Sequence, residues 1–235
     1  MRIWDVSPGY LARQQLLGEH RELHGLFNVL SLGKRGYARH PETLRWAGRL
    51  PALAQRHALL VEEMALRGYR HRSPLPAPTG PVAGEVDGDI QWPATYIDAP
   101  HVQFALLRGK YADGRTGRIP LPVNTQALWA QHKYSLMARD PALYAALGPE
   151  VAHGVYRHDM AGLALLLTGT LRTAPPAGRL SNALQHLWGH VGERAEAPPP
   201  AEPAALLAAI RREAARQHEP YLLASTAISE LGLWV

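Results

Sequence analysis

Apolar residues recur at helical spacing along most of the chain. Between Leu16 and Leu30 they repeat at intervals of three, four or seven residues, and the run stops at Gly33. This period is typical of one buried face of an α-helix, and a glycine is a common residue just past a helix end. The "SPGY" sequence upstream predicts the start of this helix, with Ser7 as the cap and Pro8 as the first helical residue.

The same pattern predicts helices over most of the remaining chain. No strand pattern is longer than four residues, no internal repeat is present, and residues 73–95, rich in proline and glycine, are expected to be irregular. The fold class is therefore predicted to be all-α. The further helices are expected at about 41–49, 51–67, 100–111, 124–140, 141–148, 149–172, 181–195 and 204–219.

The sequence "DGRTGRIPLP" at 113–122 is the best candidate for a domain boundary, because glycine, proline and charge concentrate there between two helical patterns. We therefore expect two helical domains, residues 1–118 and 119–235.

Composition narrows the class of protein. At 235 residues, with 46% hydrophobic and 19% charged residues, the chain is typical of a soluble globular protein. It has no cysteine, which excludes disulfides and thiolate metal sites. No apolar run approaches the ~20 residues of a membrane span, and no secretion signal is evident, so a cytoplasmic protein is expected.

The net charge of +5 is placed unevenly. Residues 1–118 contain 16 Lys and Arg against 11 Asp and Glu, whereas residues 119–235 contain nine of each. A basic front half suits a polyanion, because phosphate contacts and counterion release drive such binding. An Arg-rich solvated surface explains the charge equally well.

The first residues and the first helix could together form a reactive site. Six extended residues span about 20 Å, and helix residues 8–22 rise about 21 Å, so a chain that folds back brings Met1 level with Glu22. An α-amine has an ordinary pKa of about 8 against about 10.4 for lysine, so more of it is nucleophilic at neutral pH. An amine that attacks a sugar C1′ forms a Schiff base, and a neighbouring carboxylate can move protons. Spacing alone favours the alternative of a frayed terminus, with Glu22 pairing on the surface with Arg2 or Arg21.

The opening pattern "MRI…Q..L..EHREL" resembles the start of the pyrimidine-dimer DNA glycosylases of the phage endonuclease V type. The resemblance implies that Met1 supplies the nucleophilic amine and that Glu22 is the catalytic acid. It also implies that Arg2, the arginine following the amine, binds the substrate and that Arg21 contacts the lesion. "GKRGY", "LAQRHALLVEEMALRGY" and, more weakly, "YIDAPHVQFALLRGKY" extend the similarity to about residue 115. The resemblance implies the helical fold of that family for the first domain, with no metal and no organic cofactor.

The chain departs from the family at three points. The phage-type enzyme loses its first methionine to expose threonine, whereas Met1 before the bulky Arg2 is expected to be retained. A family arginine just beyond the glutamate falls on Gly25, and His24 replaces a proline. The aromatic, lysine-rich C-terminal loop has no clear counterpart.

A basic loop could bind the DNA backbone. Tyr37 and Trp46 interleave with its charges and could stack on bases, although a core position is favoured for Trp46. The candidate phosphate-binding residues are Lys34, Arg35, Arg39 and Arg45.

The second half, from about residue 124, resembles the YbgA-like bacterial domain of unknown function through "LWAQHKYSLMARDPALYAALG", "SNALQHLWGH" and "EPYLL". His186 and His190 are four residues apart and could share a metal, but no HExxH arrangement is present. Hydrogen-bonded histidines on a packed helix face are favoured instead.

Together these features predict a DNA-repair glycosylase with β-elimination lyase activity on damaged double-stranded DNA, pyrimidine dimers first, in the cytoplasm at the nucleoid. No membrane partner is expected, and residues 119–235 could contact a protein. The alternatives are a non-catalytic module that binds damaged DNA or another nucleic acid, and a glycosylase for a different lesion.

Overall fold

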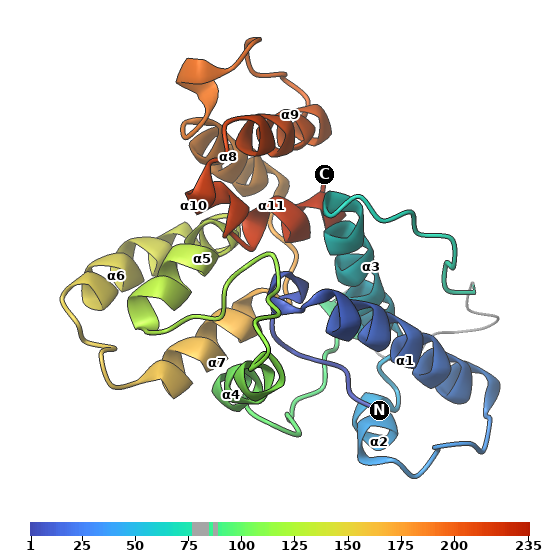
Figure 1. The fold of residues 1–235 in the computed structure, drawn as a ribbon. Helices are drawn as coiled ribbons and strands as arrows, with labels where there is room; N and C mark the ends of the chain where they lie inside the picture. The colour runs from blue at the N-terminus through green and yellow to red at the C-terminus, as the bar shows by residue number, and fades with distance from the viewer. Residues whose placement is uncertain (77–84, 87–88) are drawn as a thin grey trace.

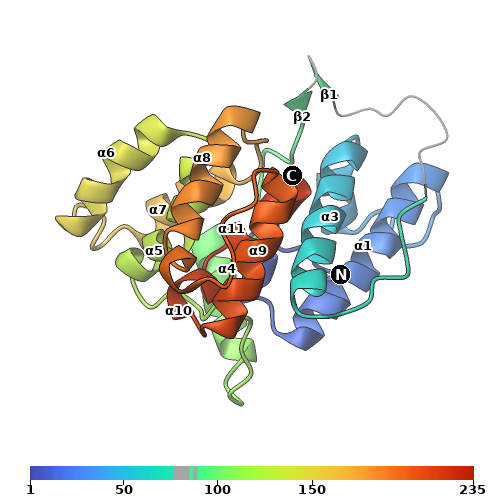
Figure 2. The same cartoon turned by 90° about the horizontal axis from the view of Figure 1, so that it is seen from above.

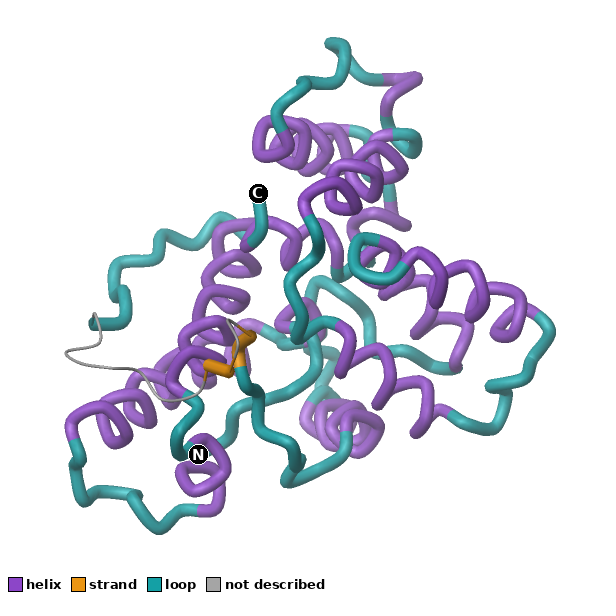
Figure 3. The backbone as a smooth tube through the Cα atoms, turned by 180° about the vertical axis from the view of Figure 1, so that it is seen from behind, coloured by secondary structure: helices purple, strands orange, loops and turns teal. Residues whose placement is uncertain are grey.

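The computed structural model describes residues 1–76, 85–86 and 89–235. The described chain contains eleven α-helices, which confirms the all-α prediction (Figure 1). Two antiparallel strands of two residues each, β1 (Glu85–Val86) and β2 (Asp89–Ile90), are the exception among the described residues, and Figure 3 shows them in orange. None of the described helices is long and apolar enough to cross a membrane.

The front half is built on two helices that lie side by side, α1 and α3 (Figures 1 and 2). Gly33 ends the first of them in a left-handed conformation with φ of 61°, as the sequence predicts. The elements of this half are η1 (Pro8–Tyr10), α1 (Arg13–Leu32), α2 (Pro41–Trp46), α3 (Leu50–Leu66) and α4 (Pro100–Lys110).

The start of the first helix was predicted wrongly. Ser7 does cap a turn, accepting a hydrogen bond from the Gly9 N–H, but this turn is a single 3₁₀ segment. The chain then runs extended through Leu11 and Ala12, because the Ala12 N–H donates to the Tyr111 hydroxyl at 2.8 Å. α1 therefore begins five residues later than expected.

The back half also departs from one predicted boundary. The expected break at Pro149 is wrong, since α6 continues through it and the chain turns only at Gly154, where φ is 80°. The Asp159 side chain then caps the next helix. The elements are α5 (Thr125–Met137), α6 (Pro141–Ala152), α7 (Met160–Thr170), α8 (Ala177–Trp188), η2 (Gly192–Arg194), α9 (Pro203–Arg216), α10 (Pro220–Leu223), α11 (Ala227–Glu230) and η3 (Leu231–Leu233).

Two apolar clusters form the core. The larger contains side chains from the front half and from α5, α6 and α7, and the smaller is formed mainly by α8, α9 and the C-terminal helices. The segment between the two halves is anchored to both. Arg118 pairs with Glu63 at 2.8 Å and donates to the Leu223 carbonyl at 2.6 Å, and Ile119 is buried. The proposed division at 118/119 stays a prediction.

Candidate functional site

The first residues fold back along α1 in an extended conformation. The backbone N–H of Arg2 donates to Oε2 of Glu22, and the N–H of Trp4 donates to Oε1 of Glu19 at 3.2 Å. Arg2 and Trp4 are two positions apart in the extended segment, and their backbone N–H groups bind carboxylates that lie about one helical turn apart on α1. This pairing brings the start of the chain to the middle of α1.

The contact of Trp4 with Glu19 is buried. Arg56 of α3 forms a paired ionic hydrogen bond with Glu19, with Nε–Oε1 at 2.7 Å and Nη2–Oε2 at 2.9 Å. Its third nitrogen donates to the Val6 carbonyl at 3.0 Å, and the residue is only 2% exposed. Arg56 therefore fixes the N-terminal segment, α1 and α3 to one another.

The contact of Arg2 with Glu22 lies beside a pocket. Glu22 and Met1 are half-buried and line a hollow of about 490 Å³, a size within the usual range for a small-molecule site. Three covalent bonds join the Met1 nitrogen to the Arg2 nitrogen, so the amine lies within about 6 Å of the carboxylate. The other residues that line it are Gly25, Asn28, Val29, Lys34, Gly36 and Tyr37.

A second hollow, of about 390 Å³, lies on the other side of Glu22 and is lined in part by Arg2 and Arg21. The Arg2 guanidinium pairs with Asp98 at 2.5 Å and lies 4.8 Å from the centre of the Trp4 ring. Arg21 is exposed. The structure therefore brings Met1, Arg2 and Glu22 together, whereas Arg21 lines only the hollow that Met1 does not reach. Arg2 already has a carboxylate partner that the sequence did not indicate.

The basic loop after α1 is mostly open to solvent. Lys34, Arg35 and Arg39 are exposed, and Lys34 lines the same pocket as Met1. Tyr37 is 74% exposed and borders both that pocket and a neighbouring hollow formed with Arg35 and Arg39. These side chains are accessible to a ligand larger than the pocket itself.

Two residues expected beside this loop lie elsewhere. Arg45 is buried between Asp5, at 3.0 Å, and Glu42, at 2.6 Å, because two carboxylates in the core require a cation. It cannot belong to a surface patch. Trp46 is fully buried, which confirms its favoured core position and excludes stacking on a base.

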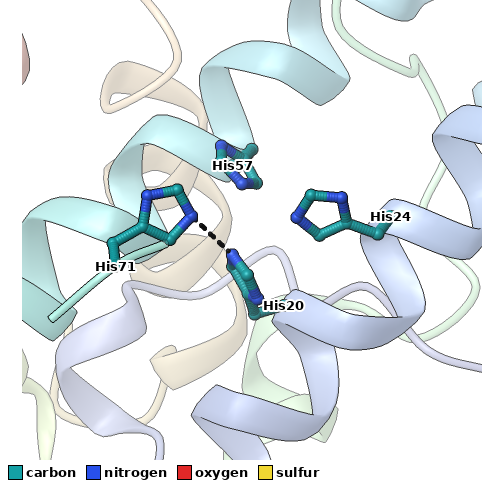
Figure 4. A group of neighbouring side chains, drawn as sticks. All are labelled: His20, His24, His57 and His71. Carbon is teal, nitrogen blue, oxygen red and sulfur yellow. Dashed lines mark hydrogen bonds between the residues drawn. The ribbon is translucent and has the colours of Figure 1, made fainter. Parts of the chain in front are cut away.

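Four histidines form a cluster that the sequence reasoning missed. His20 and His24 project from α1, His57 from α3 and His71 from the segment after α3 (Figure 4). Burial, and then the neighbouring imidazoles, lower the pKa of His20 and of His57 to about 4, so both rings are neutral at pH 7. Burial also lowers the pKa of His24. The signal was present in "EHRELH", because residues four apart share a helix face.

The other histidine pair does not converge. α8 ends at Trp188, so His190 lies beyond it, while His186 is exposed on the helix. His190 hydrogen-bonds the Tyr134 hydroxyl at 2.6 Å and stacks on Tyr221 with ring centres 5.1 Å apart. His190 is therefore packed and hydrogen-bonded as expected, but the expected helix face is wrong, because the helix ends before this residue.

Comparison with known families confirms both resemblances. Residues 1–77 match the family model for pyrimidine dimer DNA glycosylase, and residues 133–230 match the model for a protein of unknown function, DUF1722. No curated protein and no solved structure gives a significant match. The first match supports a pyrimidine dimer DNA glycosylase-like role for the front segment and implies DNA as its substrate.

Proposed function

We propose that this protein is a DNA glycosylase with abasic-site lyase activity, which acts on damaged duplex DNA through a Schiff base to the Met1 amine. Pyrimidine dimers are the first expected lesion, because the front segment matches that family. The observation that carries the proposal is the hydrogen bond from the Arg2 N–H to Glu22, since it holds a carboxylate beside the first residue at an open pocket.

The chemistry requires one nucleophile and one carboxylate. The unprotonated amine of Met1 attacks C1′ of the damaged nucleoside, the glycosidic bond breaks, and the proton that the new C1′ amine loses passes to the departing base. The nitrogen lone pair then opens the C1′–O4′ bond, O4′ takes a proton from water, and the resulting iminium ion has its positive charge stabilised by the Glu22 carboxylate. Glu22 then removes a C2′ proton, the C3′–O bond breaks by β-elimination, and water hydrolyses the imine to restore the amine.

Access to C1′ requires the damaged nucleotide to leave the stack. Arg21 is exposed beside Glu22 and suits a contact to the displaced nucleotide or its phosphate. Lys34, Arg35 and Arg39 suit phosphate contacts that position the duplex, while Arg2, paired with Asp98, orders the residue next to the nucleophile.

Borohydride trapping tests the proposal. A duplex containing an abasic site or a pyrimidine dimer, incubated with the untagged protein and borohydride, should give a covalent adduct whose DNA mass maps to the peptide containing Met1. A variant with residues added before Met1 should bind the duplex without forming the adduct. Equal cleavage by the extended and the untagged proteins would contradict the proposal.

The same experiment separates the alternatives. Binding to damaged duplex without any adduct would identify a non-catalytic damaged-DNA module. An adduct on abasic DNA, with base release from a lesion other than the dimer, would identify a glycosylase of the same chemistry with a different pocket.

A further inference from the structure

None of the residues of the four-histidine cluster lines the amine pocket, and the proposed chemistry does not use the cluster. One ligand nitrogen from each of His20, His24, His57 and His71 lies within 4.8 Å of each of the others. The ring centres of His20 and His24 are 4.7 Å apart, and those of His24 and His57 are 5.0 Å apart. Figure 4 shows the four imidazoles arranged around one point.

The cluster contains nitrogen atoms that lack partners. Within the described part of the chain, Nε2 of His24 and Nε2 of His57 are buried with no hydrogen-bond partner. The one hydrogen bond inside the cluster joins Nε2 of His20 to Nε2 of His71 at 3.1 Å. Buried polar atoms are normally satisfied, because leaving one unpaired is destabilising. The Ser73 backbone lies close to both rings, yet neither Nε2 atom has a partner with hydrogen-bonding geometry. A single cation among the four rings would satisfy both atoms.

We propose that these four histidines bind one divalent transition-metal ion, and that Zn²⁺ fits the site best. Zn–N bonds of about 2.0–2.1 Å in a tetrahedron place the ligand nitrogens about 3.3–3.4 Å apart. The 3.1 Å between His20 and His71 is already near this value, and the remaining separations need only small side-chain rotations to reach it. Neutral imidazole suits zinc, copper and nickel, whereas magnesium and calcium require oxygen ligands.

Four protein ligands leave no open position on a tetrahedral ion, which is typical of a structural site and not of a catalytic one. The ion would join α1, α3 and the segment that contains His71. His20 and His24 flank Glu22 in the sequence but project away from the amine pocket, toward α3. The ion therefore clamps the α1–α3 pair on which the candidate catalytic carboxylate stands, and this inference does not depend on the proposed activity.

Metal binding by the full chain, purified without a histidine tag, tests this directly. We expect one equivalent of Zn²⁺ by elemental analysis after dialysis, and Co²⁺ should give the intense visible absorption of tetrahedral coordination. Unfolding should shift upward by about 5–10 °C when free Zn²⁺ is about a hundred times its Kd. Mg²⁺ and Ca²⁺ should cause no shift. Substoichiometric zinc with no thermal shift would overturn the proposal.

Single variants locate the site. His24→Ala and His71→Ala truncate half-buried side chains, so the core stays intact, and each should weaken Zn²⁺ binding at least about tenfold in competition with a chelator. His158→Ala changes an exposed histidine in the loop between α6 and α7 and should bind like the wild type. Wild-type affinity in both cluster variants, with unchanged circular dichroism, would show that zinc binds elsewhere and would refute the assignment.

Discussion

Glu19 and Glu22 lie three residues apart on the same helix, and each accepts a backbone N–H from the N-terminal segment. The two carboxylates differ in burial and in their partners. Glu19 is buried, and both of its oxygens are bound by Arg56, whereas Glu22 is half-buried beside a pocket of about 490 Å³. The same kind of contact thus has two surroundings: at the closed end, the buried Glu19, it fixes the segment, and at the open end, Glu22, it leaves a carboxylate lining a pocket.

Removing the charge of Glu22 should have the largest effect. Glu22→Gln keeps an oxygen that can accept the Arg2 N–H, so the segment stays in place, but the amide cannot take up a proton. We expect cleavage of an abasic duplex to fall by about 10²- to 10⁴-fold, with DNA affinity nearly unchanged. Single-turnover cleavage and fluorescence anisotropy measure the two quantities. Glu150→Gln, at an exposed position, is the control. Cleavage by Glu22→Gln at the wild-type rate would remove the distinction between the two carboxylates.

Breaking the buried Glu19–Arg56 pair, at the closed end, should lower the free energy of unfolding. Arg56→Ala leaves Glu19 buried without its cation, and removal of one partner from a buried pair costs about 3–5 kcal/mol of unfolding free energy. Urea denaturation measures this loss. Arg115→Ala breaks an exposed pair with Asp113 and should leave the unfolding transition unchanged. A loss below about 1 kcal/mol for Arg56→Ala, the value of a surface pair, would mean that Glu19 does not anchor the segment.

The difference between the two ends also explains what the sequence could reveal. Extended-chain and helix lengths allowed the Met1–Glu22 approach, and the family resemblance favoured it, although spacing alone did not. The Glu19–Arg56 pair joins residues 37 positions apart on different helices, and no local pattern indicates such a partner. Arg45 was assigned to the surface for the same reason, because its charge is visible in the sequence but Asp5 and Glu42 are brought to it only by folding.

Helices were predicted well where a long apolar period ends at glycine, as at Gly33. The prediction failed where a single residue was taken as a boundary. Pro149 lies inside α6, and Ser7 starts only a 3₁₀ turn. The histidine cluster needed three segments together, so the His20–His24 spacing gave only half of it.

A third test concerns a buried histidine that contacts the N-terminal segment further along the chain. The Tyr10 hydroxyl lies 3.3 Å from Nδ1 of His132 in α5. Burial lowers the pKa of His132 to about 4. Below pH about 6.5 the unfolded chain therefore binds a proton that the folded chain does not, so stability falls as the pH drops from about 6.5 to about 4.

His132→Phe should remove this contribution, which amounts to about 3 kcal/mol across that pH range. The pH dependence of the unfolding free energy should become shallower by that amount, while His20 and His57, whose pKa is also lowered to about 4, keep their own contributions in both proteins. Urea titrations between neutral pH and about pH 4 measure the difference between the two proteins. His153→Phe, at an exposed site, should keep the wild-type slope. Parallel wild-type and His132→Phe profiles would show that His132 does not stay neutral when buried.

The smallest effect is expected on DNA affinity, from changes in the basic loop that follows α1 and borders the Met1 pocket. Removing one side chain that neutralises a phosphate should reduce the slope of log binding constant against log salt by about 0.9. Lys34→Ala, Arg35→Ala and Arg39→Ala should each show this change and weaken binding to damaged and undamaged duplexes alike, because phosphate contacts position the DNA without reading it. Arg212→Ala removes an exposed charge from α9 and should leave the slope unchanged. If the three loop variants keep the wild-type slope, the duplex does not lie against this loop, and the pocket beside Met1 must then be approached from the Arg21 side of Glu22.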